Sequence, residues 1–154
     1  MKIDDVIGDK AAQAEGEWIE FKPGISFKLI FSAKGKPRDF FQKGLSKLRQ
    51  KHRGNIPFDK QQDLTLEMLY KLVVLDWKGW EQDDPENPGQ SIPFPYSREN
   101  CQRLLTDSTV IRDFVAEESG DIENFGGKLD ADEEDTAKGA MKSSASLDPR
   151  VREK

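Results

Sequence analysis

Residues that could perform catalysis are scarce in this chain of 154 residues. It has one histidine, His52, and one cysteine, Cys101, so a nucleophile activated by a histidine would have to use them. His52 falls on the apolar stripe of a predicted helix, where a histidine more often caps the helix or lies at the edge of the core. Cys101 is followed at helical spacing by Leu104 and Leu105, which is typical of a small buried apolar residue. The sequence therefore predicts no catalytic residue, and we expect the protein not to be an enzyme.

Sites for metals, nucleotides and other cofactors are not indicated either. A single histidine and a single cysteine cannot form the ligand clusters that zinc requires. Asp130, Asp132 and Glu134 have the spacing with which a calcium loop begins, but the glycine and the final glutamate of such a loop are missing. Gly35-Lys36 lacks both the earlier glycine and the following serine or threonine of a phosphate-binding loop. We expect no cofactor and no cofactor-binding or metal-binding residues.

Charge is distributed unevenly along the chain. The segment from Ala33 to Arg53 has eight Lys and Arg against one acidic residue, whereas the segment from Asp76 to Phe125 has four basic residues against twelve acidic ones. This asymmetry predicts charged partners or self-association through unlike surfaces. The basic segment could follow a phosphate backbone, but the chain is acidic overall, with a net charge of −5, and has no recognised nucleic-acid motif. Nucleic acid is therefore the less favoured partner.

The composition is typical of a protein of the cell interior. No apolar run approaches the roughly 18 residues of a membrane span, and the first ten residues lack the apolar segment of a signal peptide. A single cysteine cannot form an internal disulfide, which is consistent with a reducing compartment. We expect no contact with a membrane.

The distribution of apolar residues predicts three regions. Residues 1–16 have few large apolar groups and end in a run of small and polar residues, which predicts a flexible N-terminal arm. Residues 17–125 hold the aromatic and aliphatic residues of one globular, α-rich domain. Residues 126–154 contain no aromatic residue and only scattered Leu, Met and Val, so they predict a disordered charged tail.

A β-hairpin opens the predicted domain. Residues 17–22 and 25–31 are rich in aromatic and β-branched residues, and the second segment alternates in polarity. Pro23-Gly24 between them is a turn signal, because proline presets the first central position of a type II turn and glycine provides the positive φ of the second. Such a turn does not match the twist of a tight hairpin, so we expect an irregular register.

A basic amphipathic helix is predicted over residues 36–53, with Pro37 at the first helical position, where its missing N–H is no loss. A second helix should begin at a capping box formed by Asp59 and Gln62. Its apolar positions between Leu64 and Trp77 cover nearly the whole circumference, which is typical of a helix at the centre of the core.

Two shorter helices follow an acidic loop at residues 83–89, which contains two prolines. Ser97 can cap the first of these helices, and Asp107 or Ser108 can cap the second. The predicted fold class is therefore α+β, mainly α, with an N-terminal β-hairpin followed by a small bundle of about four helices.

Motifs in the second half of the chain can be compared with a protein family. A segment rich in Val and Trp is followed by an acidic turn, a segment of alternating apolar residues and prolines, and leucine- and phenylalanine-containing helices. These motifs are Val73-Val74-Leu75-Asp76-Trp77-Lys78-Gly79-Trp80, Ile92-Pro93-Phe94-Pro95-Tyr96-Ser97-Arg98-Glu99-Asn100, Leu104-Leu105, Ile111, Phe114-Val115 and Phe125. With the hairpin and basic helix before them, residues 17–125 resemble the tail assembly chaperones of long-tailed bacteriophages with non-contractile tails.

The resemblance implies a protein that binds the tape measure protein, keeps it soluble and helps to recruit tail tube subunits during tail morphogenesis. Contact with the tail tube protein would use a frameshift-extended form, of which this chain would be the shorter version. The resemblance also implies a location in the cytoplasm of the infected bacterial host and absence from the mature virion.

A chaperone of this kind would recognise an apolar helix in a groove. The residues predicted to contact the partner are Phe40, Phe41, Lys43, Leu45, Lys47 and Leu48. The alternative is that the four apolar residues of this set simply pack on the central helix. Two other functions stay open: a structural tail completion or connector protein of the virion, and a nucleic-acid-binding protein that uses the basic helix 36–53.

Overall fold

A computed structural model describes residues 1–129 of the chain. A three-stranded antiparallel sheet of order β1-β2-β3 and a separate two-stranded sheet, β4-β5, are combined with six α-helices in this range. The elements are α1 (Ile3–Ile7), α2 (Lys10–Glu15), β1 (Glu17–Lys22), β2 (Ile25–Leu29), α3 (Gly35–Lys51), α4 (Phe58–Met68), the π-helical turn η1 (Leu69–Val73), β3 (Val74–Lys78), β4 (Glu81–Asp83), β5 (Ser91–Pro93), α5 (Arg98–Asp107), α6 (Thr109–Ser119) and the 3₁₀ turn η2 (Ile122–Phe125). The predicted fold class, α+β and mainly α, is confirmed.

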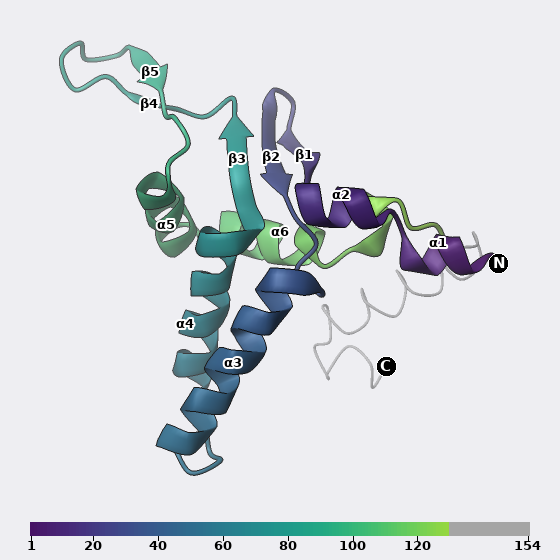
Figure 1. The fold of residues 1–154 in the computed structure, drawn as a ribbon. Coiled ribbons are helices and arrows are strands. Elements are labelled where there is room, and N and C mark those ends of the chain that lie inside the picture. Colours follow the sequence, from purple (N-terminus) through teal and green to yellow (C-terminus); the bar gives the residue numbers. More distant parts are fainter. Residues whose placement is uncertain (130–154) are drawn as a thin grey trace, which may run out of the picture.

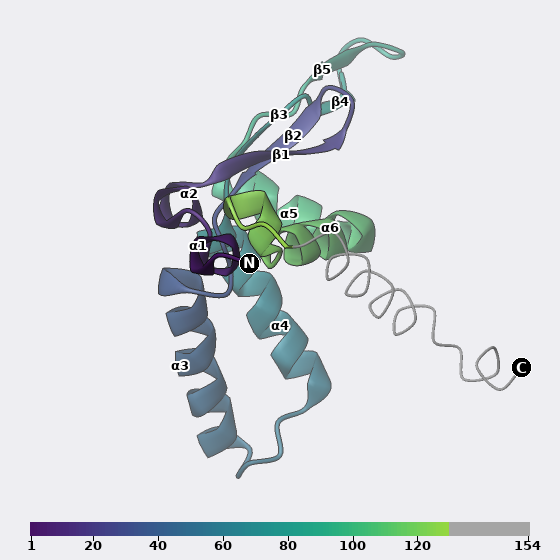
Figure 2. The same ribbon diagram turned by 90° about the vertical axis from the view of Figure 1, so that its right-hand side faces the viewer.

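Two projections leave the body of the molecule in opposite directions (Figure 1). Helices α3 and α4 run side by side away from the three-stranded sheet, and the β4-β5 hairpin lies at the other end of the molecule. The quarter-turned view shows the same arrangement (Figure 2). None of the helices within residues 1–129 is both long and apolar enough to cross a membrane.

The predicted N-terminal hairpin is confirmed. Strands β1 and β2 pair antiparallel with Ile19 opposite Phe27, and Gly24 has the positive φ of 85° that the turn requires. The register shifts between Glu20 and Lys22, which is the irregularity expected from the turn type. Phe27 and Leu29 point to the same side of β2 and are fully buried, so this side of the sheet faces the core.

The predicted central helix is only partly correct. Helix α4 ends at Met68, and after the π-helical turn the chain becomes strand β3, which pairs with β2. A short apolar run fits a buried strand as well as a buried helix, and here the unpaired edge of β2 decides the outcome because its backbone groups need partners. The predicted capping box is also wrong: Pro57 occupies the N-cap of α4, which has no side-chain cap.

The flexible N-terminal arm is a second correction. Residues 3–15 form α1 and α2, and Asp9 caps α2 by accepting hydrogen bonds from the amides of Ala11 and Ala12. The backbone N–H of Asp9 donates to Phe125 O at 2.7 Å, and that of Phe31 donates to Gln13 O at 3.0 Å. These attachments are made by backbone groups, so they leave no pattern of apolar side chains in the sequence.

The caps predicted for the last two helices are confirmed. Ser97 accepts a hydrogen bond from the N–H of Asn100 at the start of α5, and Ser108 accepts one from Ile111 at the start of α6. The predicted place of Pro37 is wrong: helix α3 begins at Gly35, so Pro37 is its third residue, which still lies in the first turn, where a missing N–H costs no intrahelical hydrogen bond.

The acidic segment differs from the single loop that was predicted, because β4 and β5 pair on either side of it. This hairpin is attached to the core by Trp77, whose Nε1 donates to Phe94 O at 2.9 Å while the two rings stack at 5.5 Å. Tyr96 adds a hydrogen bond from its hydroxyl to Val74 O at 2.9 Å. The tryptophan and proline-aromatic motifs of the sequence thus hold β3 against the segment that follows β5.

The core lies between the buried side of the sheet and helices α5 and α6. Its fully buried members are Phe27, Leu29, Leu69, Val73, Cys101, Leu105, Val115 and Phe125. At the end of the described chain, the N–H of Lys128 donates to Asp5 O at 2.6 Å. The rest of the predicted tail, residues 130–154, lies outside the described residues.

Candidate functional site

The pair of helices α3 and α4 forms the candidate binding surface, and we call residues 35–68 the helical arm. Gly44 lets the two helices approach closely, because a Cβ atom at this position would lie 2.4 Å from Leu64 Cδ1. At the tip, Arg53 and Gly54 both have positive φ, and the N–H of Gly54 donates to Arg49 O at 2.8 Å. His52 is the C-cap of α3, where its N–H donates to Leu48 O at 2.9 Å.

The six residues predicted to contact a partner divide into three groups in the structure. Phe40 and Phe41 are half-buried and pack against the core, so these two rings are at least in part structural. Leu45 and Leu48 are half-buried further along the arm. Their positions relative to Phe41 and Gly44 place them on the side of α3 that faces α4. The remaining two, Lys43 and Lys47, are exposed.

A hollow of about 290 Å³ lies between the helical arm and α6, on the side of the arm formed largely by α4. Phe58 is prominent at its edge, because 71% of its surface is exposed. The lining residues are Phe41, Phe58, Gln61, Gln62, Thr65, Arg112, Asp113 and Ala116. The lining combines apolar with polar side chains, which is the general character of a site that accepts an apolar side chain.

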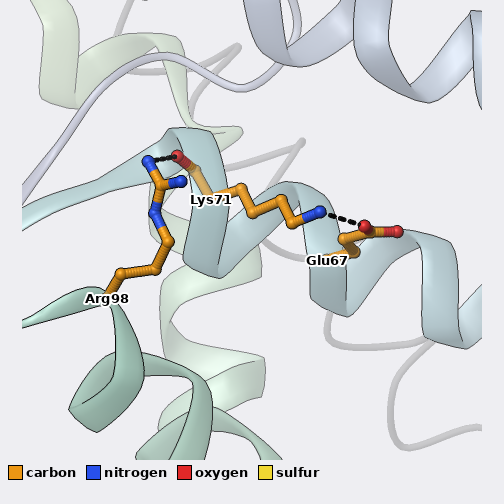
Figure 3. A network of polar contacts seen from close by, with 3 residues as sticks. All are labelled: Glu67, Lys71 and Arg98. Carbon is orange, nitrogen blue, oxygen red and sulfur yellow. Dashed lines mark hydrogen bonds and ion pairs between the residues drawn. The ribbon is translucent and has the colours of Figure 1, made fainter.

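No acidic side chain of residues 1–129 forms an ion pair with the cationic residues of α3. Within residues 1–129, one ion pair is formed, between Lys71 and Glu67, which lie one helical turn apart where α4 continues into η1. Figure 3 shows this pair and Arg98, whose Nη2 donates to Lys71 O at 3.4 Å and so connects the base of the arm to α5. The hydrogen bond that Lys71 Nζ donates to the Glu67 carboxylate raises the pKa of Lys71. The exposed lysines of α3 therefore present their charge to solvent.

Groups with a capacity for chemistry do not gather at the arm. Burial raises the pKa of the Cys101 thiol to about 12, so this thiol is protonated at neutral pH and is a poor nucleophile. Within residues 1–129 no three His, Cys, Asp or Glu side chains form a group that could hold a metal ion. The residues of the candidate calcium loop, Asp130, Asp132 and Glu134, lie outside this range.

Comparison with known proteins identifies the family. The model of the YdaY prophage protein family matches residues 38–138, which is most of the chain. The chain belongs to the YdaY prophage protein family. No curated protein and no solved structure matches it. The phage or prophage origin expected from the sequence motifs is thereby confirmed.

The range that the YdaY family model matches can be compared with the elements of the fold. It begins at Arg38, in the first turns of α3, and so includes nearly all of the helical arm, strand β3 and the helices that complete the core. Strands β1 and β2 lie before it. The helical arm is therefore part of what defines the family.

Sequence reasoning missed Phe58 as a surface residue. The sequence contained a signal for this, because Phe58 directly follows Pro57 and lies about 100° around the helix from the buried stripe of Leu64 and Met68. A large aromatic residue off the apolar stripe of its own helix is a candidate contact residue. Val110, on α6, has the same character with 66% of its surface exposed.

Proposed function

We propose that this YdaY-family prophage protein is a tail assembly chaperone that binds helical segments of the tape measure protein along its helical arm. In this proposal it keeps the tape measure protein soluble in the host cytoplasm and helps to recruit tail tube subunits. The observation that carries the proposal is the hollow beside α4, which is lined by the exposed Phe58 and the half-buried Phe41. Prophage family membership and the resemblance of residues 17–125 to tail assembly chaperones support it.

The physical basis is recognition of an amphipathic helix. Apolar side chains one turn apart on a partner helix could enter the hollow, while Gln61 and Gln62 provide polar contacts at its border. A hollow of about 290 Å³ accepts only one or two side chains, so each copy would bind weakly. Many copies along one extended partner would make the assembly stable, because neighbouring sites on the same chain raise the effective concentration.

Co-expression tests the proposal. This chain should keep the long helical protein encoded beside it in the prophage soluble and should co-purify with it in several copies per partner. The variant Phe58→Asp should lose co-purification, because it places a charge at the edge of the hollow without disturbing the core.

Ile3→Asp is the matched control, because Ile3 is also 71% exposed but lies on α1, away from the hollow. It should retain the partner. Both variants should keep the circular dichroism spectrum and melting temperature of the wild type. Equal binding by Phe58→Asp and the wild type would contradict the proposed surface. Failure of the wild type to bind, together with its presence in stoichiometric amount in purified virions, would favour a structural tail completion or connector protein instead.

A further inference from the structure

The two projections of the molecule carry opposite charge. The segment from Gly35 to Arg53, which consists of helix α3 and the two residues after it, holds seven Lys and Arg against one acidic residue. The β4-β5 hairpin holds four acidic residues and no basic residue between Glu81 and Pro93. Figures 1 and 2 place these projections at opposite ends of the molecule, so they cannot neutralise each other within one chain.

The positive end has a regular geometry. Lys36, Lys43, Lys47 and Lys51 are separated by seven, four and four residues, which aligns them along one flank of α3. All four are exposed, and none pairs with an acidic side chain of the described chain. We call these four residues the lysine row. Neighbouring members one turn apart are spaced by about 6 Å.

The negative end has a matching spacing. Glu81 and Asp83 occupy alternate positions of β4, so their side chains leave the same side of the strand about 7 Å apart. Both are exposed, as is Glu86 in the connecting turn. Asp84 has a different role: its carboxylate accepts hydrogen bonds from Glu86 N at 2.9 Å and Asn87 Nδ2 at 2.8 Å, which lower its pKa and fix the turn.

We propose that the acidic β4-β5 hairpin of one copy binds the lysine row of a second copy. Charge and spacing are complementary, and both surfaces lie on elements that project from the body of the molecule. Because the two surfaces differ and lie at opposite ends of the molecule, copies can join head-to-tail, and every added copy then presents one free hairpin and one free lysine row. In this arrangement the product is a linear chain of copies. Its stability depends on ionic strength, since exposed charges are screened by salt.

Sedimentation measurements with charge-reversed variants test this contact. The wild-type protein should form species larger than a monomer at about 20 mM salt and should return to the monomer at about 500 mM salt. The arm variant Lys43→Glu/Lys47→Glu should be monomeric at both salt concentrations, because its arm and its hairpin are then both acidic at their contact positions. The hairpin variant Glu81→Lys/Asp83→Lys should also be monomeric, because its two surfaces are then both basic there.

An equimolar mixture of the two variants provides the decisive measurement. The reversed arm of one variant complements the reversed hairpin of the other, and their two unchanged surfaces also complement each other, so association at low salt should return. The control variant Lys2→Glu/Lys10→Glu makes the same change in net charge outside the helical arm and should associate like the wild type. A wild type that is monomeric at low salt, an arm variant that associates undiminished, or a mixture that stays monomeric would each overturn the proposal.

Discussion

Replacing Trp77 by phenylalanine tests how the second hairpin is attached to the core. The substitution removes the hydrogen bond from Trp77 Nε1 to Phe94 O, which is 2.9 Å long and buried. A buried carbonyl left without its donor costs about 1–3 kcal/mol, and the smaller ring also forfeits part of its packing against Phe27 and Phe94. We therefore expect the free energy of unfolding to fall by about 2–3 kcal/mol.

Thermal and urea denaturation followed by circular dichroism measure this loss. For a domain of this size each kcal/mol corresponds to roughly 3–6 °C, so the melting temperature should fall by about 6–18 °C. Trp18→Phe is the matched control, because Trp18 is 43% exposed on the other side of the sheet, and it should change the free energy of unfolding by less than about 0.5 kcal/mol. Equal losses in the two variants would refute the role assigned to the hydrogen bond.

Three further predictions concern other parts of the molecule. Leu69→Ala, at a fully buried position of η1, should destabilise the fold by about 2–5 kcal/mol in urea denaturation, and a neutral result would mean that η1 does not organise the core. The Cys101 thiol has a pKa of about 12 in the fold against 9.0 for a free thiol, so its ionisation favours the unfolded chain. Its contribution to stability is fully present below pH 9 and is lost as the pH rises toward 12, and the difference in unfolding free energy between the wild type and Cys101→Ala should shrink over this window. Anisotropy titration with duplex DNA near 150 mM salt should show no binding tighter than about 10⁻⁶ M, because the acidic surfaces oppose a polyanion, whereas tight sequence-dependent binding would favour the nucleic-acid alternative.

Local signals in the sequence predicted those parts of the fold that local interactions decide. Pro23-Gly24 and the alternation after it gave the first hairpin, and Ser97 and Ser108 gave the starts of α5 and α6. Each of these features depends on residues within a few positions of one another. Such signals are strong because a turn or a cap is chosen largely by its own residues.

Features that depend on distant partners were missed. Val74 to Lys78 have no intrinsic property that excludes a helix, and they become a strand because β2 lies beside them. The docking of α1 and α2 depends on backbone hydrogen bonds to residues far along the chain, which no side-chain pattern reveals. For the candidate site, the sequence located the basic helix but could not separate Phe40 and Phe41, which pack on the core, from Phe58, which faces solvent.

The position of the helical arm in the chain has a consequence for how such proteins can diversify. Leu29 and Val74 are paired neighbours in the sheet, so the whole arm is inserted between two adjacent strands whose separation is fixed. Removing the same number of residues from α3 and α4 would shorten the reach by about 1.5 Å per residue pair and leave the register of the strands unchanged. Closing a shorter or longer insert changes the loop entropy only slowly with length. The length of the helical arm is therefore a property that evolution or protein engineering could change without changing the sheet. An arm from one relative could likewise be grafted onto the sheet of another.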